Sequence, residues 1–228
     1  MKSLNDANGI DTADSLAFSY SQDREPLLLM PRPLPLVPEI SLHLFPDALP
    51  SEKLEAGDFW RVMESPPYWA FCWGGGQALA RCLLDNANLV VGRRVWDFGA
   101  GSGIAGVAAL LAGACSVVAV DTDPKALQAC LANARLNHLE AISISAVCKP
   151  SSGDVVLAAD ICYEEAGLLM VRDWARAGVA VVVAESRLDS ARLQVSGLEL
   201  MNEFSVRTFP DLDEASQFDV VCIYRVNL

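Results

Sequence analysis

From residue 77 onward, short apolar runs alternate with longer amphipathic segments. The apolar runs predict strands at residues 93–98, 116–121, 142–147, 154–160, 179–185 and 218–226, with a weaker strand at 198–207. The segments between them predict helices at residues 77–84, 104–112, 124–137 and 164–177. This alternation is typical of an α/β fold, in which a parallel sheet carries helices on both faces.

The N-terminal part of the chain has a different composition, which divides the sequence into three segments. Residues 1–24 are polar and are expected to be flexible. Residues 25–65 form an arm that is expected to be largely extended, because most of the 12 prolines lie in it and proline disfavours helical backbone at the preceding residue. Residues 66–228 form the main domain.

Within the arm, apolar and polar residues alternate, which predicts a short strand with one apolar face. The apolar positions are Ile40, Leu42 and Leu44, and the polar positions are Glu39, Ser41 and His43. Two interpretations remain for the arm: it packs on the main domain, or it forms a wall of the substrate cleft.

Composition excludes several classes of function. The 228 residues, 52% of them hydrophobic, suffice for one α/β domain with an attached segment. The 17 Lys and Arg against 29 Asp and Glu give a net charge of −12, which argues against nucleic acid as a partner and favours a basic or cationic one. With only 2 histidines the chain has little material for a zinc site or a Ser-His-Asp triad, so no metal is expected.

The cysteines and the N-terminus indicate a cytoplasmic protein. The 7 cysteines include no Cys-x-x-Cys pair and their number is odd, so we expect them to be reduced. The N-terminus lacks the apolar run of a signal peptide, and prolines interrupt the apolar stretch at residues 27–37. No membrane helix is expected there, and no membrane partner.

The most informative stretch is residues 95–107, where a predicted strand runs into a glycine-rich turn and then a helix. Gly99, Gly101 and Gly103 allow a sharp turn and the close approach of a ligand to the backbone. Asp97 decides which ligand fits, because its carboxylate repels the phosphates of a dinucleotide and attracts a ligand with an ammonium and a sulfonium. These residues predict binding of S-adenosylmethionine.

A dinucleotide site is the competing interpretation. Residues 101–106 also satisfy the Gly-x-Gly-x-x-Gly fingerprint, and the acidic residue Asp121 follows at about 20 residues. Asp121 ends the predicted strand at 116–121 and would accept hydrogen bonds from ribose hydroxyls in either case, so it does not discriminate. A glycine turn without any ligand is the third alternative.

Two further groups of residues are candidates for chemistry. Residues 160–163 close a predicted strand and precede a helix, so Asp160 either takes part in chemistry or caps that helix. Residues 66–77 combine aromatic side chains with three glycines, and they either pack in the core or form a stacking surface for a ligand. Asp97, Asp121 and Asp160 each end a predicted strand, so we expect all three to line one crevice.

With these motifs, the sequence resembles the class I, seven-β-strand S-adenosylmethionine-dependent methyltransferases, and most closely the protein-lysine methyltransferases of the electron-transfer flavoprotein beta subunit. The arm at residues 37–44 is similar to that of the bacterial members, and the resemblance spans about residues 34–177. It implies a Rossmann-like, doubly wound seven-stranded sheet, mostly parallel with one antiparallel strand. The motifs that carry it are Trp-Gly-Gly-Gly-Gln-Ala-Leu at 73–79, Trp-Asp-Phe-Gly-Ala-Gly-Ser-Gly at 96–103, Val-Ala-Val-Asp-Thr-Asp-Pro at 118–124 and Asp-Ile-Cys-Tyr at 160–163.

The resemblance also implies roles for single residues. Asp97 and the backbone of residues 99–103 would hold the methionine part of S-adenosylmethionine, and Asp121 would hold the ribose. Asp160 and Tyr163 would shape the methyl-acceptor channel as the catalytic residues. The implied cofactor-binding residues are Trp73, Asp97, Gly99, Ala100, Gly101, Gly103, Asp121, Thr122, Cys148 and Asp160.

The sequence departs from this family at two places. The only acidic residue of the short segment 147–154 is Asp154 at its end, and no acidic or Asn residue stands where such enzymes contact the adenine amino group, which leaves Cys148 or a backbone amide for that contact. Ala-Glu-Ser-Arg at residues 184–187 replaces an Asp-Pro-Gly-Arg-like turn, which bears on the identity of the acceptor protein.

The favoured function is a protein-lysine N-methyltransferase that acts on a folded protein such as the electron-transfer flavoprotein beta subunit. One alternative is a methyltransferase for a small amine or another protein nitrogen. The other, from a different class, is an NAD-binding or non-catalytic nucleotide-binding protein.

Overall fold

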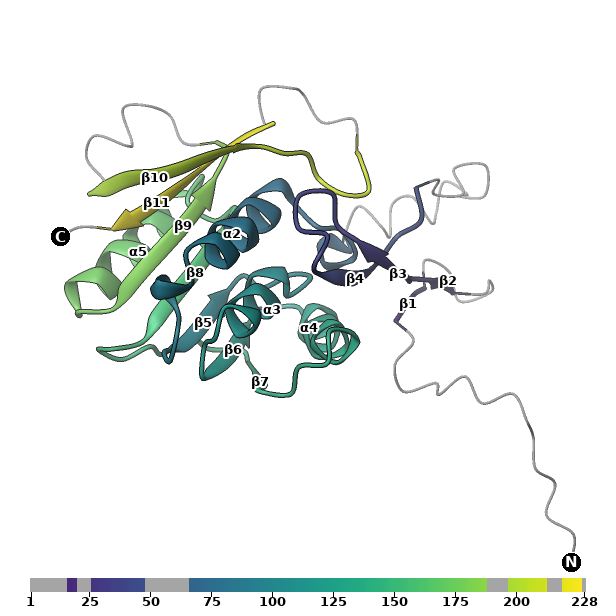
Figure 1. Cartoon of the computed structure of the whole chain (residues 1–228), viewed down its shortest axis with the longest axis horizontal. Coiled ribbons are helices and arrows are strands. Elements are labelled where there is room, and N and C mark those ends of the chain that lie inside the picture. The colour runs from purple at the N-terminus through teal and green to yellow at the C-terminus, as the bar shows by residue number, and fades with distance from the viewer. Residues whose placement is uncertain (1–15, 20–25, 48–65, 188–196, 213–218, 227–228) are drawn as a thin grey trace, which may run out of the picture.

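A central seven-stranded sheet organises the protein in the computed structural model (Figure 1). The structure describes residues 16–19, 26–47, 66–187, 197–212 and 219–226. The strands follow the order β10-β11-β9-β8-β5-β6-β7 across the sheet. Their bounds are β5 (Arg94–Phe98), β6 (Ser116–Val120), β7 (Ile142–Ser145), β8 (Val155–Ala159), β9 (Ala180–Glu185), β10 (Leu198–Ser205) and β11 (Val220–Val226).

The sheet is mostly parallel. All neighbouring strands from β9 to β7 run parallel, and β11 runs antiparallel to both β9 and β10. The expected α/β sheet of seven strands with one antiparallel strand is therefore confirmed. Every predicted strand of the sheet agrees with its observed bounds to within 2 residues.

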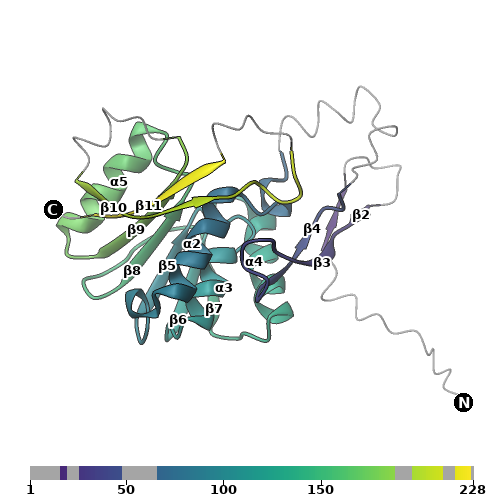
Figure 2. The ribbon, with the colours of Figure 1, turned by 45° about the horizontal axis from the view of Figure 1, so that its top comes forward.

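Helices cover both faces of the sheet (Figure 2). In β8, Val155 and Leu157 point to the face covered by α2 and α3, and Val156 and Ala158 point to the face covered by α5. Successive side chains of a strand point to opposite faces, so one apolar strand supplies two cores. The helices are α2 (Gly74–Asp85), α3 (Ile104–Leu111), α4 (Pro124–Leu136) and α5 (Glu165–Arg176).

The first of these helices begins earlier than the sequence predicts. α2 starts at Gly74 and not at Gln77, so its first turn consists of three glycines. Glycine has a low helix propensity, and a local pattern therefore gives no helical signal there. The other three helices agree with their predicted bounds to within 1 residue.

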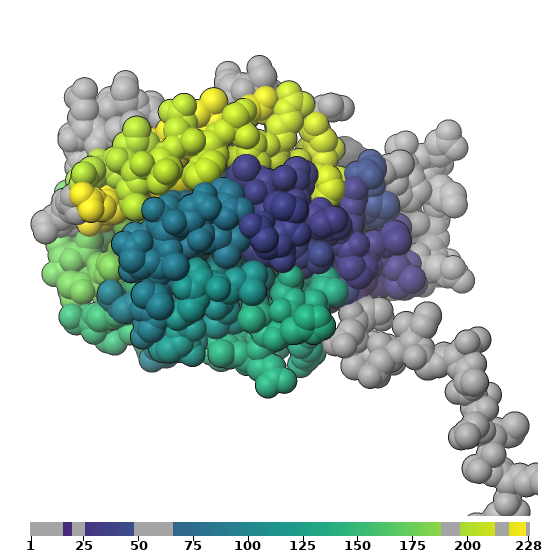
Figure 3. Space-filling model, viewed as in Figure 1, coloured from purple at the N-terminus to yellow at the C-terminus, as the bar shows by residue number. Residues whose placement is uncertain are grey.

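The arm packs on the layer formed by α2, α3 and α4. Its strands β3 (Met30–Pro33) and β4 (Ser41–Leu44) pair antiparallel. Ile40, Leu42 and Leu44 are fully buried in the core that α2 and α3 share with the sheet. In Figure 3 the arm, in purple, fills the surface between the teal helices and the yellow-green C-terminal strands.

On the polar side of β4, His43 is buried as well and Ser41 is half-buried, which differs in part from the predicted strand with one apolar face. The backbone N–H of His43 donates to Oδ1 of Asn133 on α4 at 2.8 Å, and the imidazole Nδ1 lies 3.0 Å from the same oxygen. The side-chain amide of Asn137 pairs with both the N–H and the C=O of Ser41. Two asparagines of α4 thus satisfy the edge of β4 as a neighbouring strand would.

A further short pair of strands lies near the N-terminus. β1 (Ala17–Phe18) pairs antiparallel with β2 (Leu27–Leu28). The ring of Phe18 is buried, with its centroid 5.7 Å from that of Phe45, so this part of residues 1–24 differs from the expected flexible segment. The rest of that segment, apart from residues 16–19, and residues 48–65 of the arm lie outside the described residues.

The described part of the chain contains no helix that is long and apolar enough to cross a bilayer. It also contains no group of three His, Cys, Asp or Glu side chains that could hold a metal ion. All 7 cysteines are unpaired.

Replacing Leu42 by Ala should lower the free energy of unfolding by about 2–5 kcal/mol, because a fully buried leucine leaves a cavity in the core. Leu28→Ala is the matched control, since Leu28 is 59% exposed, and it should change stability by about 0.5 kcal/mol or less. Urea unfolding followed by circular dichroism measures both values. A loss below about 1 kcal/mol for Leu42→Ala would contradict an arm that is integral to the core.

Candidate active site

A cavity of about 380 Å³ lies at the carboxyl ends of β5, β6 and β8. Its volume falls in the range of about 300–1,000 Å³ that is typical of small-ligand sites. Asp97, Asp121 and Asp160 all line it, so the prediction that the three carboxylates share one crevice is confirmed. Its other lining residues include Tyr68, Trp73, Gly99, Ala100, Gly101, Ser102, Thr122, Tyr163 and Arg187.

No described residue of the arm lines this cavity. The arm instead lies over the helices on one face of the sheet, where β4 contacts α4. Of the two interpretations of the arm, packing on the main domain is therefore the one that the structure supports.

Asp97 holds the first turn of α3. It is 3% exposed, and its Oδ2 accepts a hydrogen bond of 2.8 Å from the N–H of Gly106. In a dinucleotide-binding fold, the N-terminus of this helix binds the pyrophosphate. Here the protein's own carboxylate occupies that turn, so a phosphate would meet a like charge.

The charge of Asp97 depends on what lies beside it. Burial raises the pKa of this carboxyl to about 7, the N–H of Gly106 lowers it, and the neighbouring Asp121 raises it. A cationic ligand next to the carboxyl would favour its ionised form and would itself be stabilised. The carboxyl of Asp97 therefore favours a positively charged ligand beside it.

The glycine-rich turn provides conformation and space. Gly99, Gly101 and Gly103 have positive φ angles of 69°, 52° and 80°, which residues with a side chain rarely adopt. The N–H of Gly99 donates to the C=O of Val120, and the N–H of Gly101 donates to Oδ2 of Asp121. These two N–H groups are thus engaged within the protein, and the turn offers a ligand close approach.

Asp121 holds the turn and remains open to a ligand. Its Oδ2 accepts the bond from Gly101 and its Oδ1 accepts one from the N–H of Asp123, each at 2.9 Å. Each carboxylate oxygen has a second lone pair, so both can also accept from ligand hydroxyls. Thr122, the next residue, lines the cavity too.

Two residues of the predicted cofactor-binding set lie away from the cavity lining. Gly103 packs against Cys130 of α4, where an added Cβ would approach the Cα of Cys130 to 2.9 Å. Cys148 packs against the buried cluster that includes Trp96 and Val118, on the face of the sheet that carries α5. The structure therefore does not bring Cys148 to the cavity.

Asp160 faces the start of α2. Its φ is 53°, and its N–H donates to the C=O of Ala184 at 3.0 Å, just beyond the end of β8. Its carboxylate lies against Gly75, where any Cβ would overlap it. Trp73, the N-cap residue of α2, forms no side-chain cap bond, so the Asp160 carboxylate is the negative charge at the positive end of this helix.

The alternative that Asp160 caps the following helix does not hold. α5 starts at Glu165, and its N-cap residue is Glu164. The carboxylate of Asp160 instead belongs to the cavity and to the first turn of α2.

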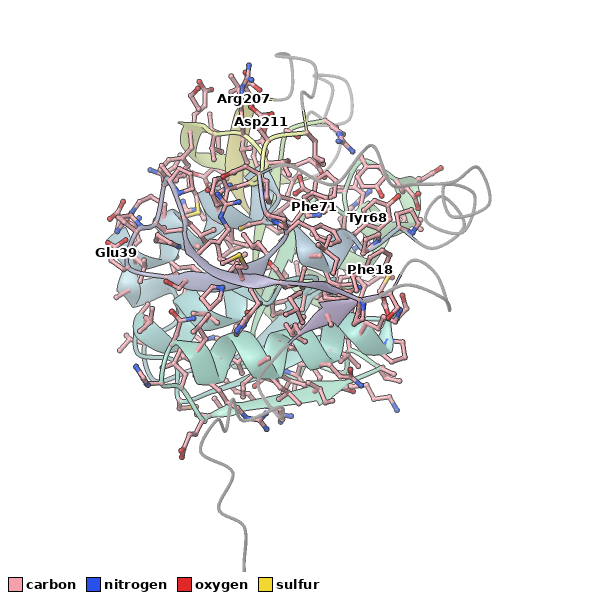
Figure 4. The ribbon with its side chains drawn as sticks, turned by 90° about the vertical axis from the view of Figure 1, so that its right-hand side faces the viewer. Phe18, Glu39, Tyr68, Phe71, Arg207 and Asp211 are labelled. Atoms are coloured by element: carbon pink, nitrogen blue, oxygen red, sulfur yellow. The ribbon has the colours of Figure 1, made fainter. Side chains whose placement is uncertain are left out.

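The aromatic run is divided between the core and the cavity. Trp69 and Phe71 are buried in a cluster with Phe18, and Figure 4 shows Phe18, Phe71 and Tyr68 on the same side of the molecule. Tyr68 and Trp73 line the cavity with their ring centroids 5.7 Å apart, and Nε1 of Trp73 donates to the C=O of Tyr68. Core packing is therefore the correct interpretation for part of this run, and a surface that a ligand can contact is the correct one for Tyr68 and Trp73.

Tyr163 and Arg187 meet at the cavity. The guanidinium of Arg187 lies 5.8 Å from the centroid of the Tyr163 ring, which is a cation–π distance. Burial raises the pKa of Tyr163, Glu164 raises it further, and Arg187 lowers it. Tyr163 is the predicted residue of this pair, and Arg187 is a residue of the site that was not predicted from the sequence.

Glu185 is a further residue at the site that the sequence motifs did not indicate. This residue is 2% exposed, and its carboxylate accepts backbone N–H groups from two loops at the cavity. A signal for it exists, because Glu185 is an acidic residue at the end of an apolar strand, as Asp97 is.

Comparison with known proteins gives matches over the central part of the chain. A family model described as ribosomal protein L11 methyltransferase (PrmA) matches residues 67–163. An electron transfer flavoprotein beta subunit lysine methyltransferase from Danio rerio is 42% identical over 137 residues, which cover 58% of this chain and 51% of the relative. A ribosomal protein L11 methyltransferase from Marinobacter nauticus is 53% identical over 76 residues, or 32% of this chain and 25% of that protein.

This chain spans about half the length of the curated lysine methyltransferases that it matches. Among solved structures, magnesium protoporphyrin IX methyltransferase from Synechocystis PCC 6803, with bound SAM, superposes with a TM-score of 0.50. That match covers 67% of this chain and 78% of the other at 17% sequence identity. The likeness shows a shared fold.

The affinity for S-adenosylmethionine should rise between pH 6 and pH 8. Its positive charge favours ionised Asp97, and with a pKa of about 7 this carboxyl is mostly protonated at pH 6 and mostly ionised at pH 8. The expected change in Kd is roughly tenfold, from about one tenth to about nine tenths ionised. Calorimetric titration across this pH range measures it.

Asp97→Asn is the control for that titration. The variant should bind more weakly and should show only the pH dependence that comes from the ligand's own groups. Identical pH dependence in the wild type and the variant would contradict the assignment of the titration to Asp97.

Proposed function

We propose that this chain, a class I S-adenosylmethionine-dependent methyltransferase related to the electron transfer flavoprotein beta subunit lysine methyltransferases, methylates a lysine side chain of a folded protein. The hydrogen bond from the N–H of Gly106 to the carboxylate of Asp97 carries the proposal. A negative charge at the start of α3 disfavours the pyrophosphate of NAD and favours a cationic ligand.

The residues of the cavity fit S-adenosylmethionine. Asp97 suits its positive groups, Asp121 suits the ribose hydroxyls, and Trp73 offers an aromatic face. The glycine turn allows the close approach that a ligand of this size needs. When bound, S-adenosylmethionine supplies a methyl group on a positively charged sulfur that is already activated for transfer.

The protein's own task is to present a neutral amine in the right orientation, and such positioning supplies most of the catalysis. A lysine amine has a reference pKa of about 10.4, so only about one molecule in a thousand is neutral near physiological pH. Arg187 adds a positive charge at the cavity, which disfavours the charged ammonium and lowers the pKa of an amine beside it.

Asp160 and Tyr163 act on the amine directly in this proposal. Asp160 accepts a hydrogen bond from the amine, orients it and passes its proton to water. The exposed ring of Tyr163 stabilises the cation through its π face. The position of Asp160 against the first turn of α2 keeps its carboxylate in one orientation.

The proposed substrate is a folded protein with a lysine among basic residues, and the electron-transfer flavoprotein beta subunit is the first candidate. The net charge of −12 supports a basic partner, and the relatives from Danio rerio and Homo sapiens are named for that subunit. We also propose a cytoplasmic location, which the unpaired cysteines support.

Asp160→Asn and Tyr163→Phe should each reduce methyl transfer to the beta subunit by about a hundredfold or more, because each removes a group that acts on the amine. Affinity for S-adenosylmethionine should change by less than about threefold, since the donor is held by other residues. Transfer of labelled methyl groups to the purified subunit gives the rates, and calorimetry gives the affinities. Near-normal rates in both variants would overturn the roles of these residues.

Methylation of the protein substrate should slow as salt rises from 0.1 to 1 M, because the screening length falls from about 10 Å to about 3 Å. The loss should appear in kcat/KM and not in kcat, since charge attraction acts mainly on association. A free small amine serves as the comparison acceptor and should respond less. A small amine that is the better acceptor would overturn the protein-substrate proposal in favour of the small-amine alternative.

A further inference from the structure

We propose that Glu185 is a positioning residue for the methyl acceptor: its buried carboxylate ties together the two loops that carry Tyr163 and Arg187. This inference rests on the proposed methyl-transfer function, because it concerns the acceptor side of the same cavity. Glu185 itself does not line the cavity, so it acts through the residues that it holds.

The carboxylate of Glu185 divides its two oxygens between two loops. Oε2 accepts a hydrogen bond of 2.9 Å from the N–H of Cys162, in the loop that follows β8. Oε1 accepts the N–H groups of Ser186 and Arg187 at 3.1 and 3.3 Å, in the loop that follows β9. One side chain therefore bridges two segments that are 23 residues apart in the sequence.

This bridge extends the pairing of β8 and β9 beyond the last residues of the ladder. Ala159 pairs with Ala184, and the N–H of Asp160 donates to the C=O of Ala184. Past Ala159 the β8 segment leaves the sheet, and the side chain of Glu185, the last residue of β9, provides the next connection between the two segments. On one loop Glu185 holds Cys162, the residue directly before Tyr163, and on the other loop it holds Arg187 itself.

The environment of Glu185 makes the bridge rigid. The side chain is 2% exposed, and burial raises its pKa while the three N–H groups and Arg187 lower it. On the Tyr163 side, α5 packs closely, since a Cβ at Gly167 would overlap the C=O of Ile161. A buried carboxylate with several N–H donors permits few alternative orientations.

Tyr163 and Arg187 depend on this arrangement for their relative position. Their 5.8 Å cation–π contact joins side chains from the two bridged loops. A loop shift of about 1 Å misaligns reacting groups and is enough to slow a positioned reaction by about a hundredfold. The loss of Glu185 should therefore reduce catalysis more than donor binding, because Asp97 and Asp121 lie on β5 and beyond β6.

Asp154 is a matched buried carboxylate with a structural role. It is 8% exposed and directly precedes β8, so it lies at the end of the strands that is opposite the cavity. Its carboxylate accepts hydrogen bonds from the N–H of Ser151 and from Nε1–H of Trp96. It does not line the cavity. Its substitution therefore measures how much stability the protein loses with a buried carboxylate that has no role at the cavity.

The experiment compares Glu185→Gln with Asp154→Asn in the full chain. Each change keeps the shape of the side chain and removes its charge. In Glu185→Gln the new NH₂ group also opposes a backbone N–H, because both oxygens of Glu185 accept one. Four quantities are measured: the urea midpoint of unfolding, the Kd for S-adenosylmethionine, kcat and KM for the protein acceptor, and hydrogen exchange of the amides of residues 162, 186 and 187.

Glu185→Gln should lower kcat by about tenfold or more, keep the Kd for S-adenosylmethionine within about twofold, and speed exchange at the three amides. Asp154→Asn should lower the urea midpoint and keep kcat within about twofold. An unchanged kcat in Glu185→Gln, or an equal loss of kcat in both variants, would overturn the positioning role.

Glu185→Asp replaces Glu185→Gln if the latter does not fold. Aspartate keeps the charge but is one methylene shorter, so it should lose the bond from Cys162. The loss of kcat should be smaller than the loss expected for Glu185→Gln. A wild-type protein that binds S-adenosylmethionine but methylates no acceptor overturns the proposed function instead. In that case hydrogen exchange decides this inference, and unchanged exchange at the three amides in the Glu185 variant overturns it.

Discussion

The parallel pairing of β5 with β6 on one side and β8 on the other is the constraint on which the site depends. The register sets Asp97 opposite Ala119 and Leu157, so Asp121 and Asp160 follow at the same edge of the sheet, just past the ends of their strands. Three carboxylates in one cavity repel one another, and the raised pKa of Asp97 reflects its burial and the nearby Asp121. Such a cluster is tolerable where a cation binds among them.

Two of these carboxylates use the same device. Asp97 meets the first turn of α3 at Gly106, and Asp160 meets the first turn of α2 at Gly75. In each case a glycine leaves room for the carboxylate. The N–H groups in the first turn of a helix have no partner within the helix, and their partial positive charge stabilises the carboxylate. The cavity thereby gains one negative charge where the methyl donor is proposed to bind, at Asp97 beside α3, and another where the acceptor is proposed to bind, at Asp160 beside α2. This separation suits a reaction in which a methyl group passes from a cationic donor to a basic acceptor.

The layer of helices and arm supports the site from one face. Asn133 of α4 receives the bond from His43 of the arm and donates through Nδ2 to the C=O of Ser102 in the glycine-rich turn, at 2.8 Å. The arm, α4 and the turn are therefore connected through one buried amide. Arm residues contribute to the site through packing, although none of those described lines the cavity.

The sequence by itself determined the helices and strands and the part of the cavity that is assigned to the methyl donor. Strand and helix periodicities are local, and Asp97 lies near the end of β5, directly before the glycine turn, so this residue and its role could be predicted. Only the tertiary structure identified Glu185 and Asn133, whose partners lie 23 and 90 residues away. It also decided which aromatic residues line the cavity and that Cys148 does not. These features depend on the distance between segments that meet only after the sheet has formed, and no local pattern of residues records that distance.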